Sequence, residues 1–302
     1  MSNENTYDRN KGLPLYSPRK KGKDDIIKGI ELLNKLSGLD HFLNIGYADS
    51  FFEYWLLKPG ISSKRLTEEL IRPISNIIGE NILVIGAGKG GELTLLNELT
   101  GAKIIGVEPS EYNIMHAKEL VKKENKGKDI KILKGIAERL PFPDQFFSCV
   151  YSCEAAFHFE DKKAFIEEAH RVLKNSGVFI IGDITKKDNL VQNKIVDDYK
   201  AMLNTEKFFT KDDYLGVIEE TFRKRPEIDE ITDKNIKHLA KGSELLIKIL
   251  EFIENFPLLK IKIDRRLNTR NLNLSTFLEN IRTTKLSYKK SVIEYLRIIC
   301  VK

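Results

Sequence analysis

Short apolar runs alternate with segments of helical periodicity through the middle of the chain. Each run is rich in β-branched residues and is bounded by glycine or polar residues, as is typical of buried strands. The alternation predicts a mostly parallel sheet with helices on both faces. The predicted strands are 81–86, 103–108, 129–133, 145–152 and 178–182, and the predicted helices between them are 93–99, 109–123 and 161–173. Ser110 is the predicted N-cap of the helix at 109–123, and residues 175–177 are predicted to form a turn.

Further elements are predicted on both sides of this alternation. Two amphipathic helices, 24–36 and 64–78, precede it, and the aromatic stretch 46–55 (GYADSFFEYW) separates them. After Asp183 the pattern loosens. A helix at 212–222 and strands at 227–231 and 292–301 complete a predicted sheet of seven strands.

The pattern divides the chain into four parts. We expect a polar lead-in at 1–23, a core at 24–233, a helical cap inserted at 234–290 and a final core strand at 291–302. The cap contains SELLIKILEFI, which is apolar on too many sides for a lone surface helix. We therefore expect it to cover either a substrate cavity or the partner subunit of a homodimer.

Composition indicates a globular protein, and the charge is unevenly placed. The 302 residues are 41% hydrophobic and 31% charged, with a net charge of +6. Residues 1–23 and 258–302 hold 17 basic and five acidic groups, so the stretch between them is acidic. The basicity that suggests a nucleic-acid partner therefore lies at the two ends.

The sequence predicts a cytoplasmic protein with no metal site. No apolar block of signal-peptide length lies near the start, and no run of 18 apolar residues occurs. The three cysteines, Cys149, Cys153 and Cys300, are an odd number and lack the spacing of zinc ligands.

The strongest chemical signal is a glycine cluster that follows the first strand and opens a helix. Gly86, Gly88 and Gly90 let the chain turn tightly and let its backbone approach a ligand. Glu108 ends the next strand, where a carboxylate can accept hydrogen bonds from both ribose hydroxyls of an adenosine. NAD and S-adenosylmethionine (SAM) both suit this geometry.

Four ordered segments between about residues 40 and 185 resemble the class I SAM-dependent methyltransferases, in the branch that methylates quinones, tocopherols, sterols and natural-product sugars. ILVIGAGKGG resembles the first motif and IIGVEPS the ribose motif. GIAERLPFPDQFFSCVYSCEAAFHFED is similar to the adenine loop and active-site segment, and EEAHRVLKNSGVFIIGDI to the following helix and strand. The resemblance implies a Rossmann-like α/β fold and SAM as cofactor.

The resemblance also implies which residues hold SAM. Val84 and Ile136 differ from the family, because acidic residues usually stand at both positions. The expected cofactor-binding residues are Gly86, Ala87, Gly88, Gly90, Glu108, Pro109, Ala137, Glu138, Cys153 and Tyr47.

Three residues are candidates for catalysis. His158 follows the fourth strand, at the sheet edge where ligands bind, and a histidine with a pKa near 6.5 suits a general base. Glu154 shares a face with His158 if the segment is helical, and would orient that base or act as the base for a carbon nucleophile. Asp183 is predicted to end the fifth strand at the same edge, or to cap the next helix.

The resemblance predicts a small organic acceptor, with O-methylation favoured over N- and C-methylation. The basic residues of the C-terminal stretch suggest a solvated face, an anionic-substrate pocket or, last, a nucleic-acid surface. Ser152-Cys-Glu-Ala stands where base methyltransferases of this fold carry an Asn/Asp-Pro-Pro-aromatic motif. The alternatives are a SAM-binding protein without catalysis, an RNA- or protein-directed methyltransferase and an NAD-dependent dehydrogenase. The basic residues are Lys260, Lys262, Arg265, Arg266, Arg270, Arg282, Lys285, Lys289 and Lys290.

Overall fold

The computed structural model describes the sheet and most of the helices around it. Outside the described residues lie the predicted lead-in, the helix at 24–36, residues 49–55 of the aromatic stretch and most of the apolar segment at 243–253. The described residues are 46–48, 59–72, 81–187, 193–203, 205, 208–238, 240–241, 247–248, 251–252, 255–256 and 274–302.

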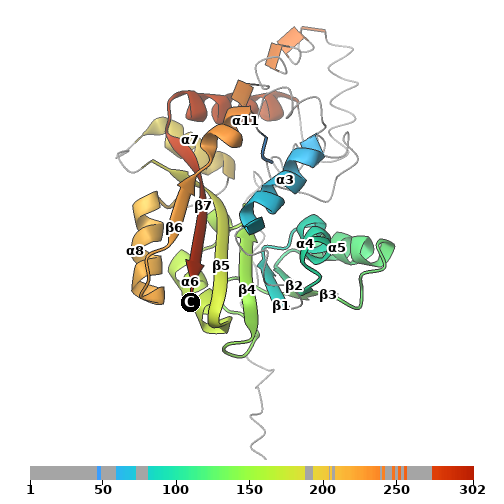
Figure 1. Ribbon diagram of the computed structural model, residues 1–302. Helices are drawn as coiled ribbons and strands as arrows, with labels where there is room; N and C mark the ends of the chain where they lie inside the picture. Colours follow the sequence, from blue (N-terminus) through green and yellow to red (C-terminus); the bar gives the residue numbers. More distant parts are fainter. Residues whose placement is uncertain are drawn as a thin grey trace, which may run out of the picture.

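A seven-stranded sheet forms the centre of the molecule (Figure 1). Its strand order is β3-β2-β1-β4-β5-β7-β6, and only β7 runs antiparallel to its neighbours. This confirms the predicted Rossmann-like, mostly parallel α/β class. The strands are β1 (Asn81–Ile85), β2 (Lys103–Glu108), β3 (Ile130–Lys134), β4 (Phe147–Cys153), β5 (Leu173–Lys186), β6 (Glu227–Glu230) and β7 (Ile293–Val301).

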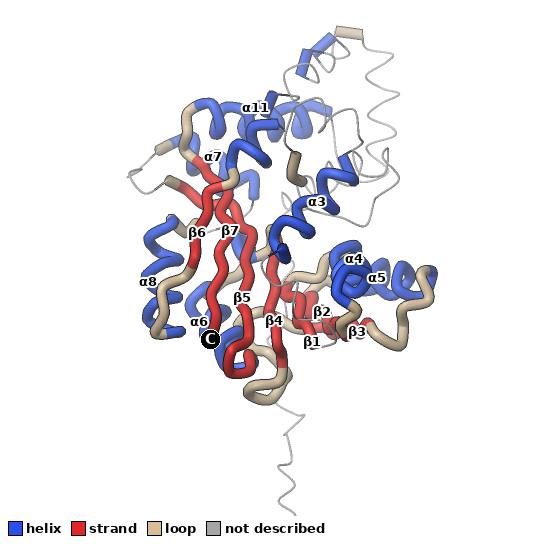
Figure 2. Tube along the Cα trace, in the orientation of Figure 1, coloured by secondary structure: helices blue, strands red, loops and turns tan. Residues whose placement is uncertain are grey.

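Helices cover both faces of the sheet (Figure 2). Their buried side chains divide into two clusters, one on each face. The first face is covered by α3 (Pro59–Ile71), α4 (Gly91–Thr100), α5 (Glu111–Lys123) and α7 (Lys194–Leu203). The second is covered by α6 (Lys162–Val172) and α8 (Lys211–Phe222), while α11 (Leu274–Lys289) packs against α7.

Side-chain caps fix where three helices begin. Ser110, the predicted cap of α5, accepts a hydrogen bond from the Asn113 N–H at 3.3 Å. Asp161 caps α6 in the same way. Thr210 and Asp213 form a reciprocal capping box at α8. Each cap satisfies backbone N–H groups that the helix itself leaves without a partner.

Strand β5 differs most from the prediction. It extends through the predicted turn at 175–177, and Ser176 has a left-handed backbone with a φ of 63°. The Ser176 N–H donates to the Lys302 carbonyl and the Lys302 N–H donates to the Gly177 carbonyl, so the end of the chain keeps this irregular stretch paired. At the other end β5 continues to Lys186, so Asp183 lies inside the strand rather than at its end.

Helix α3 lies directly on the sheet because Gly182 leaves room for it. Leu66 and Leu70 of α3 are fully buried in the first core cluster. A Cβ atom at Gly182 would lie 2.7 Å from Cδ1 of Leu70 and 2.9 Å from the Tyr295 hydroxyl. No described helix is long and apolar enough to cross a membrane.

We predict that Gly182→Ala destabilises the protein by about 1–3 kcal/mol, because the added methyl group would overpack the contact with Leu70. The matched control is Gly216→Ala in α8, where nothing lies within 4 Å of the added Cβ. That substitution should stabilise the helix by about 0.5–1 kcal/mol. Urea unfolding measures both, and two variants of equal stability would contradict the proposed close contact.

Candidate functional site

The glycine loop brings the end of β1 against the turn that follows β4. Gly86, Gly88 and Gly90 all have positive φ angles. A Cβ atom at Gly86 would lie 2.3 Å from the Cβ of Ala155, so only glycine fits there. Ala87 is buried, and its N–H and that of Gly86 both donate to the Val107 carbonyl of β2. The loop therefore joins the carboxyl ends of three strands.

Glu108 is fixed beneath this loop. Its side chain is only 6% exposed. One carboxylate oxygen accepts from the Gly88 N–H at 3.0 Å, and the other accepts from the Ser110 N–H and the Asn113 amide, both at 3.1 Å. Pro109 is half-buried between them. The carboxylate is thus held at the carboxyl end of β2, the position expected of a ribose ligand.

The loop at 136–140 is tied to the segment that follows His158. Ala137 is buried, as expected of a residue beside an adenine ring. Glu138 accepts hydrogen bonds on one oxygen from the Glu160 N–H at 2.7 Å and the Asp161 N–H at 3.3 Å. Glu138 therefore ties the two loops together through one of its carboxylate oxygens.

The turn after β4 is not an α-helix, so the predicted helical relation between Glu154 and His158 is wrong. Glu154 has a φ of 48°, and its N–H donates to the Gly182 carbonyl at 2.7 Å. A single 3-10 turn, Ala156–His158, follows it. The half-buried His158 ring packs against that of Phe157, with 4.3 Å between centroids.

Asp183 supports this turn from the second face of the sheet, which α6 and α8 cover. Its two carboxylate oxygens accept from the Phe157 N–H at 3.3 Å and from the Tyr214 hydroxyl at 2.6 Å. Burial raises the pKa of Asp183 to about 6, although the Lys162 charge and these hydrogen bonds oppose the shift. The carboxyl group acts on His158 through the backbone of Phe157. The sequence suggested that Asp183 ends the fifth strand or caps the next helix. In the structure it does neither, because β5 continues to Lys186.

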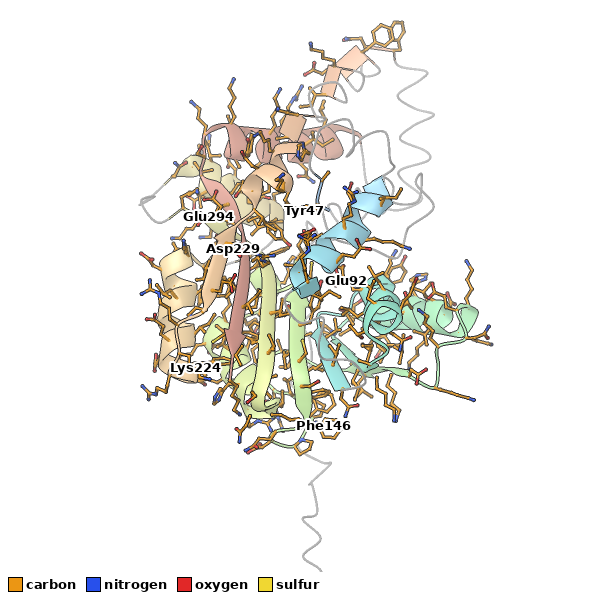
Figure 3. The ribbon with its side chains drawn as sticks, in the orientation of Figure 1. Tyr47, Glu92, Phe146, Lys224, Asp229 and Glu294 are labelled. Atoms are coloured by element: carbon orange, nitrogen blue, oxygen red, sulfur yellow. The ribbon has the colours of Figure 1, made fainter. Side chains whose placement is uncertain are left out.

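Tyr47 lies in a segment clamped between α3 and residues 232–238. The Tyr47 N–H donates to the Ser62 carbonyl and the Ala48 N–H to the Lys234 carbonyl, both at 2.8 Å. Asn235 donates to the Gly46 carbonyl at 2.6 Å. Tyr47 is half-buried against the first core cluster, beside α3 in Figure 3. The clamp joins residues 46–48 to the first residues of the predicted cap at 234–290.

A buried polar cluster beneath α3 was missed in the sequence. The Cys153 sulfur lies 3.8 Å from the Tyr295 hydroxyl, and the fully buried Tyr151 stands two residues before Cys153 on β4. Burial and the charge of Glu92 raise the pKa of Cys153. Tyr151 and Tyr295 lie in two predicted strands, 145–152 and 292–301, whose pattern does not show that their hydroxyl groups meet in the core. The sequence signal that could have revealed this polar cluster is Glu92, the acid directly after the glycine cluster.

The described residues hold no group of three or more His, Cys, Asp or Glu side chains arranged for a metal ion. Cys149, Cys153 and Cys300 are all buried as free thiols.

Comparisons with known proteins agree with this geometry. Residues 83–181, which contain the glycine loop, Glu108, Glu154 and His158, match the model of the family described as "Methyltransferase domain".

Two relatives and one solved structure illustrate the similarity. A sterol 24-C-methyltransferase of Gibberella zeae is 29% identical over 183 residues, 59% of this chain and 46% of that protein. The erythromycin 3''-O-methyltransferase of Saccharopolyspora erythraea is 31% identical over 153 residues, 49% of this chain and 47% of that protein. The chain thus matches less than half the length of these curated relatives.

The fold comparison extends over nearly the whole chain. Geranyl diphosphate C-methyltransferase from Streptomyces coelicolor A3(2) superimposes with a TM-score of 0.70 at 15% identity, covering 94% of this chain and 99% of that one. The two chains therefore have a similar overall fold, and the residues that match the family model lie within it.

We predict that the buried Asp183 makes the protein less stable as pH rises from about 4 to 7. The folded state holds the proton more tightly than the unfolded state, because the folded pKa is about 6 and the ordinary value is 3.8. The contribution of Asp183 to the free energy of unfolding is complete below pH 4, and it falls by about 3 kcal/mol as the pH rises through 6.

Unfolding measured against Asp183→Asn isolates the effect, since Asn stays neutral throughout. The free energy of unfolding of the variant should rise by about 3 kcal/mol relative to that of the wild type between pH 4 and 7. A difference between the two proteins that does not change with pH would contradict the buried, proton-binding carboxyl group.

Proposed function

We propose that the protein is a SAM-dependent methyltransferase that acts on a small organic molecule. The observation that carries the proposal is the Glu108 carboxylate, held by the Gly88 N–H at the edge of the glycine loop inside a methyltransferase domain.

The residues that would hold SAM come from five parts of the chain. Glu108 would accept from the ribose hydroxyls, with Pro109 beside it, and Gly86, Ala87, Gly88 and Gly90 would lie along the cofactor. Ala137 would border the adenine ring, and Cys153 and Tyr47 the methionine end. When bound, SAM supplies a methyl group already activated by its sulfonium.

The chain itself must orient the acceptor, exclude water and remove a proton. His158 is our candidate base for a hydroxyl group, and O-methylation is the favoured outcome. Asp183 keeps the His158 turn in place through the Phe157 N–H. We assign Asp183 as a positioning residue.

C-methylation is a second candidate, favoured by the surroundings of Glu154. Burial raises the pKa of Tyr199 and of Tyr295, and the charge of Glu154 adds to both shifts. A carboxylate at this place could take the proton of a carbon acid.

Finer features of the function remain our proposals. We propose an anionic acceptor, a cytoplasmic location and a role in natural-product biosynthesis. We also propose a homodimer through the apolar segment at 243–253. Of the basic residues considered for the acceptor, Arg282 forms an ion pair with Glu251 at 2.6 Å, which favours a solvated-face role for that residue.

The test combines binding with transfer. Calorimetric titration should show binding of SAM and S-adenosylhomocysteine, and labelled SAM should transfer its methyl group to small molecules of a fractionated extract. Binding without transfer would instead support a non-catalytic SAM-binding protein. Label in RNA or protein would support a macromolecular acceptor. Failure of both ligands to bind would overturn the proposal.

We predict that Glu108→Gln weakens SAM binding about 10- to 100-fold, because a charged acceptor is lost from the ribose hydroxyls. The control is Glu111→Gln, an exposed acid of α5 that pairs with Lys134 at 2.5 Å. Calorimetry should give an unchanged affinity for the control. Equal affinities for the two variants would exclude Glu108 as a cofactor ligand.

We predict that His158→Ala lowers kcat about 10²- to 10⁴-fold, the usual effect of removing a general base, and leaves S-adenosylhomocysteine affinity unchanged. Glu154→Gln should have the smaller effect if a hydroxyl is methylated. The reverse order in single-turnover measurements would contradict O-methylation and support the carbon acceptor.

A further inference from the structure

A groove that plays no part in the proposed function lies at the free edge of the sheet. It encloses about 610 Å³ between the second half of α5 and strand β3, at the right of Figure 1. Its buried lining is apolar and includes Val121 of α5 and Ile130 and Ile132 of β3. Leu133 also lines it and is 39% exposed. None of the residues proposed to hold SAM lines this groove.

Strand β3 forms the free edge, because it pairs with β2 and with no other strand that the structure describes. The Ile104 N–H donates to the Asp129 carbonyl, and the Gly135 N–H donates to the Glu108 carbonyl. Alternate residues of a strand bond to the same neighbour, so Ile132 turns its N–H and its carbonyl away from β2. These two groups are placed to pair with a further strand.

The loop after α5 holds one wall of the groove in place. The Lys126 N–H donates to the Val121 carbonyl at 3.0 Å, and the Lys126 ammonium group donates to the Thr94 carbonyl of α4 at 2.8 Å. The Ile130 N–H donates to the Lys126 carbonyl at 3.0 Å. The groove is therefore formed before a ligand binds, which reduces the conformational entropy lost on binding.

Four lysines give the groove a positive charge. Lys118 and Lys122 stand one turn apart on α5, Lys128 lies in the loop and Lys131 on β3, and all four are exposed. No acid lines the groove, and no acid in the described part of the chain pairs with any of these lysines. A ligand that carries several carboxylates complements this charge.

We propose that the groove binds an acidic, extended segment of a partner protein, which adds to β3 as a further strand. The backbone of the segment would bond to the free edge at Ile132, and its carboxylates would contact the four lysines. Apolar side chains between the acids would cover Val121. Neither set of contacts involves SAM or its acceptor.

Other occupants complement the groove less well. A second copy of this chain, paired through the same edge, would bring four further lysines to the four already there, and the charges would repel. Proteins that bind single-stranded nucleic acid offer aromatic side chains on which bases stack, and no aromatic residue lines this groove. A membrane surface requires apolar side chains that protrude, whereas Val121, Ile130 and Ile132 are buried.

The competing explanation is that the lysines only deter aggregation, because charged side chains on an edge strand prevent pairing between sheets. That role needs neither a groove nor an apolar lining. It predicts that an acidic strand does not bind, whereas a docking groove binds one in a way that depends on these lysines.

The experiment titrates the full chain with the peptide Ac-Glu-Val-Glu-Val-Glu-Val-Glu-NH2 and measures binding by calorimetry. We expect saturable binding that weakens as the salt concentration rises, and none of the same peptide with Lys in place of Glu. Lys118→Gln/Lys122→Gln should weaken binding about 3- to 30-fold, because two ion pairs are lost. The control is Lys123→Gln/Lys224→Gln, which removes the same charge from two exposed lysines outside the groove and should bind as the wild type does.

Peptides with N-methylated backbones test the strand geometry. Alternate residues of an added strand turn their N–H groups toward β3. Methylation of every Glu or of every Val should therefore abolish binding in one case and leave the affinity within about threefold in the other.

Each other outcome contradicts the proposal. Equal effects of the two methylated peptides would mean that binding does not use strand pairing, and equal affinities of the two lysine variants would place the peptide elsewhere. Absence of binding would support lysines that only deter aggregation. Tighter binding of oligothymidylate or of phosphatidylserine vesicles would assign this face to nucleic acid or to a membrane. Since no methyl donor is present, these results stand whether or not the protein binds SAM.

Discussion

The close approach of three backbone segments at the carboxyl ends of β1, β2 and β4 is the constraint on which the site depends. Gly86 touches Ala155 where no side chain fits between them, and the Gly86 and Ala87 N–H groups share the Val107 carbonyl. Because the segments are this close, the Gly88 N–H can reach Glu108. The ribose ligand, the loop and the turn that carries His158 are therefore fixed together.

The two faces of the sheet support this edge in different ways. On one face α3 covers a polar cluster around Cys153, and on the other the Asp183–Tyr214 pair holds the backbone of Phe157. The turn between Glu154 and His158 is thereby set from both sides. A chemical step that needs a base in a precise place gains from such preorganisation.

Local patterns were enough to predict the sheet and its glycine loop. Strands β1 and β2 consist of short apolar runs next to glycine, and both were found within one residue of their ends. The cap of α5 at Ser110 was found because its side chain acts within its own turn. Such signals depend only on neighbours in the chain.

Features that depend on distant contacts were not predicted. The extension of β5 requires pairing with Lys302, and the direction of Asp183 requires Tyr214 of α8. Glu154 was placed on a helix because spacing alone cannot reveal that its N–H bonds to Gly182 across strands. The tie between Glu138 and the backbone of Glu160 and Asp161 likewise joins segments that are more than 20 residues apart.

A crystal structure with S-adenosylhomocysteine tests the central claim most directly. The account predicts that both ribose hydroxyls bind the Glu108 carboxylate and that the sulfur lies beside Cys153, facing His158 and Glu154. A ligand that binds elsewhere, or one whose ribose does not contact Glu108, would contradict it.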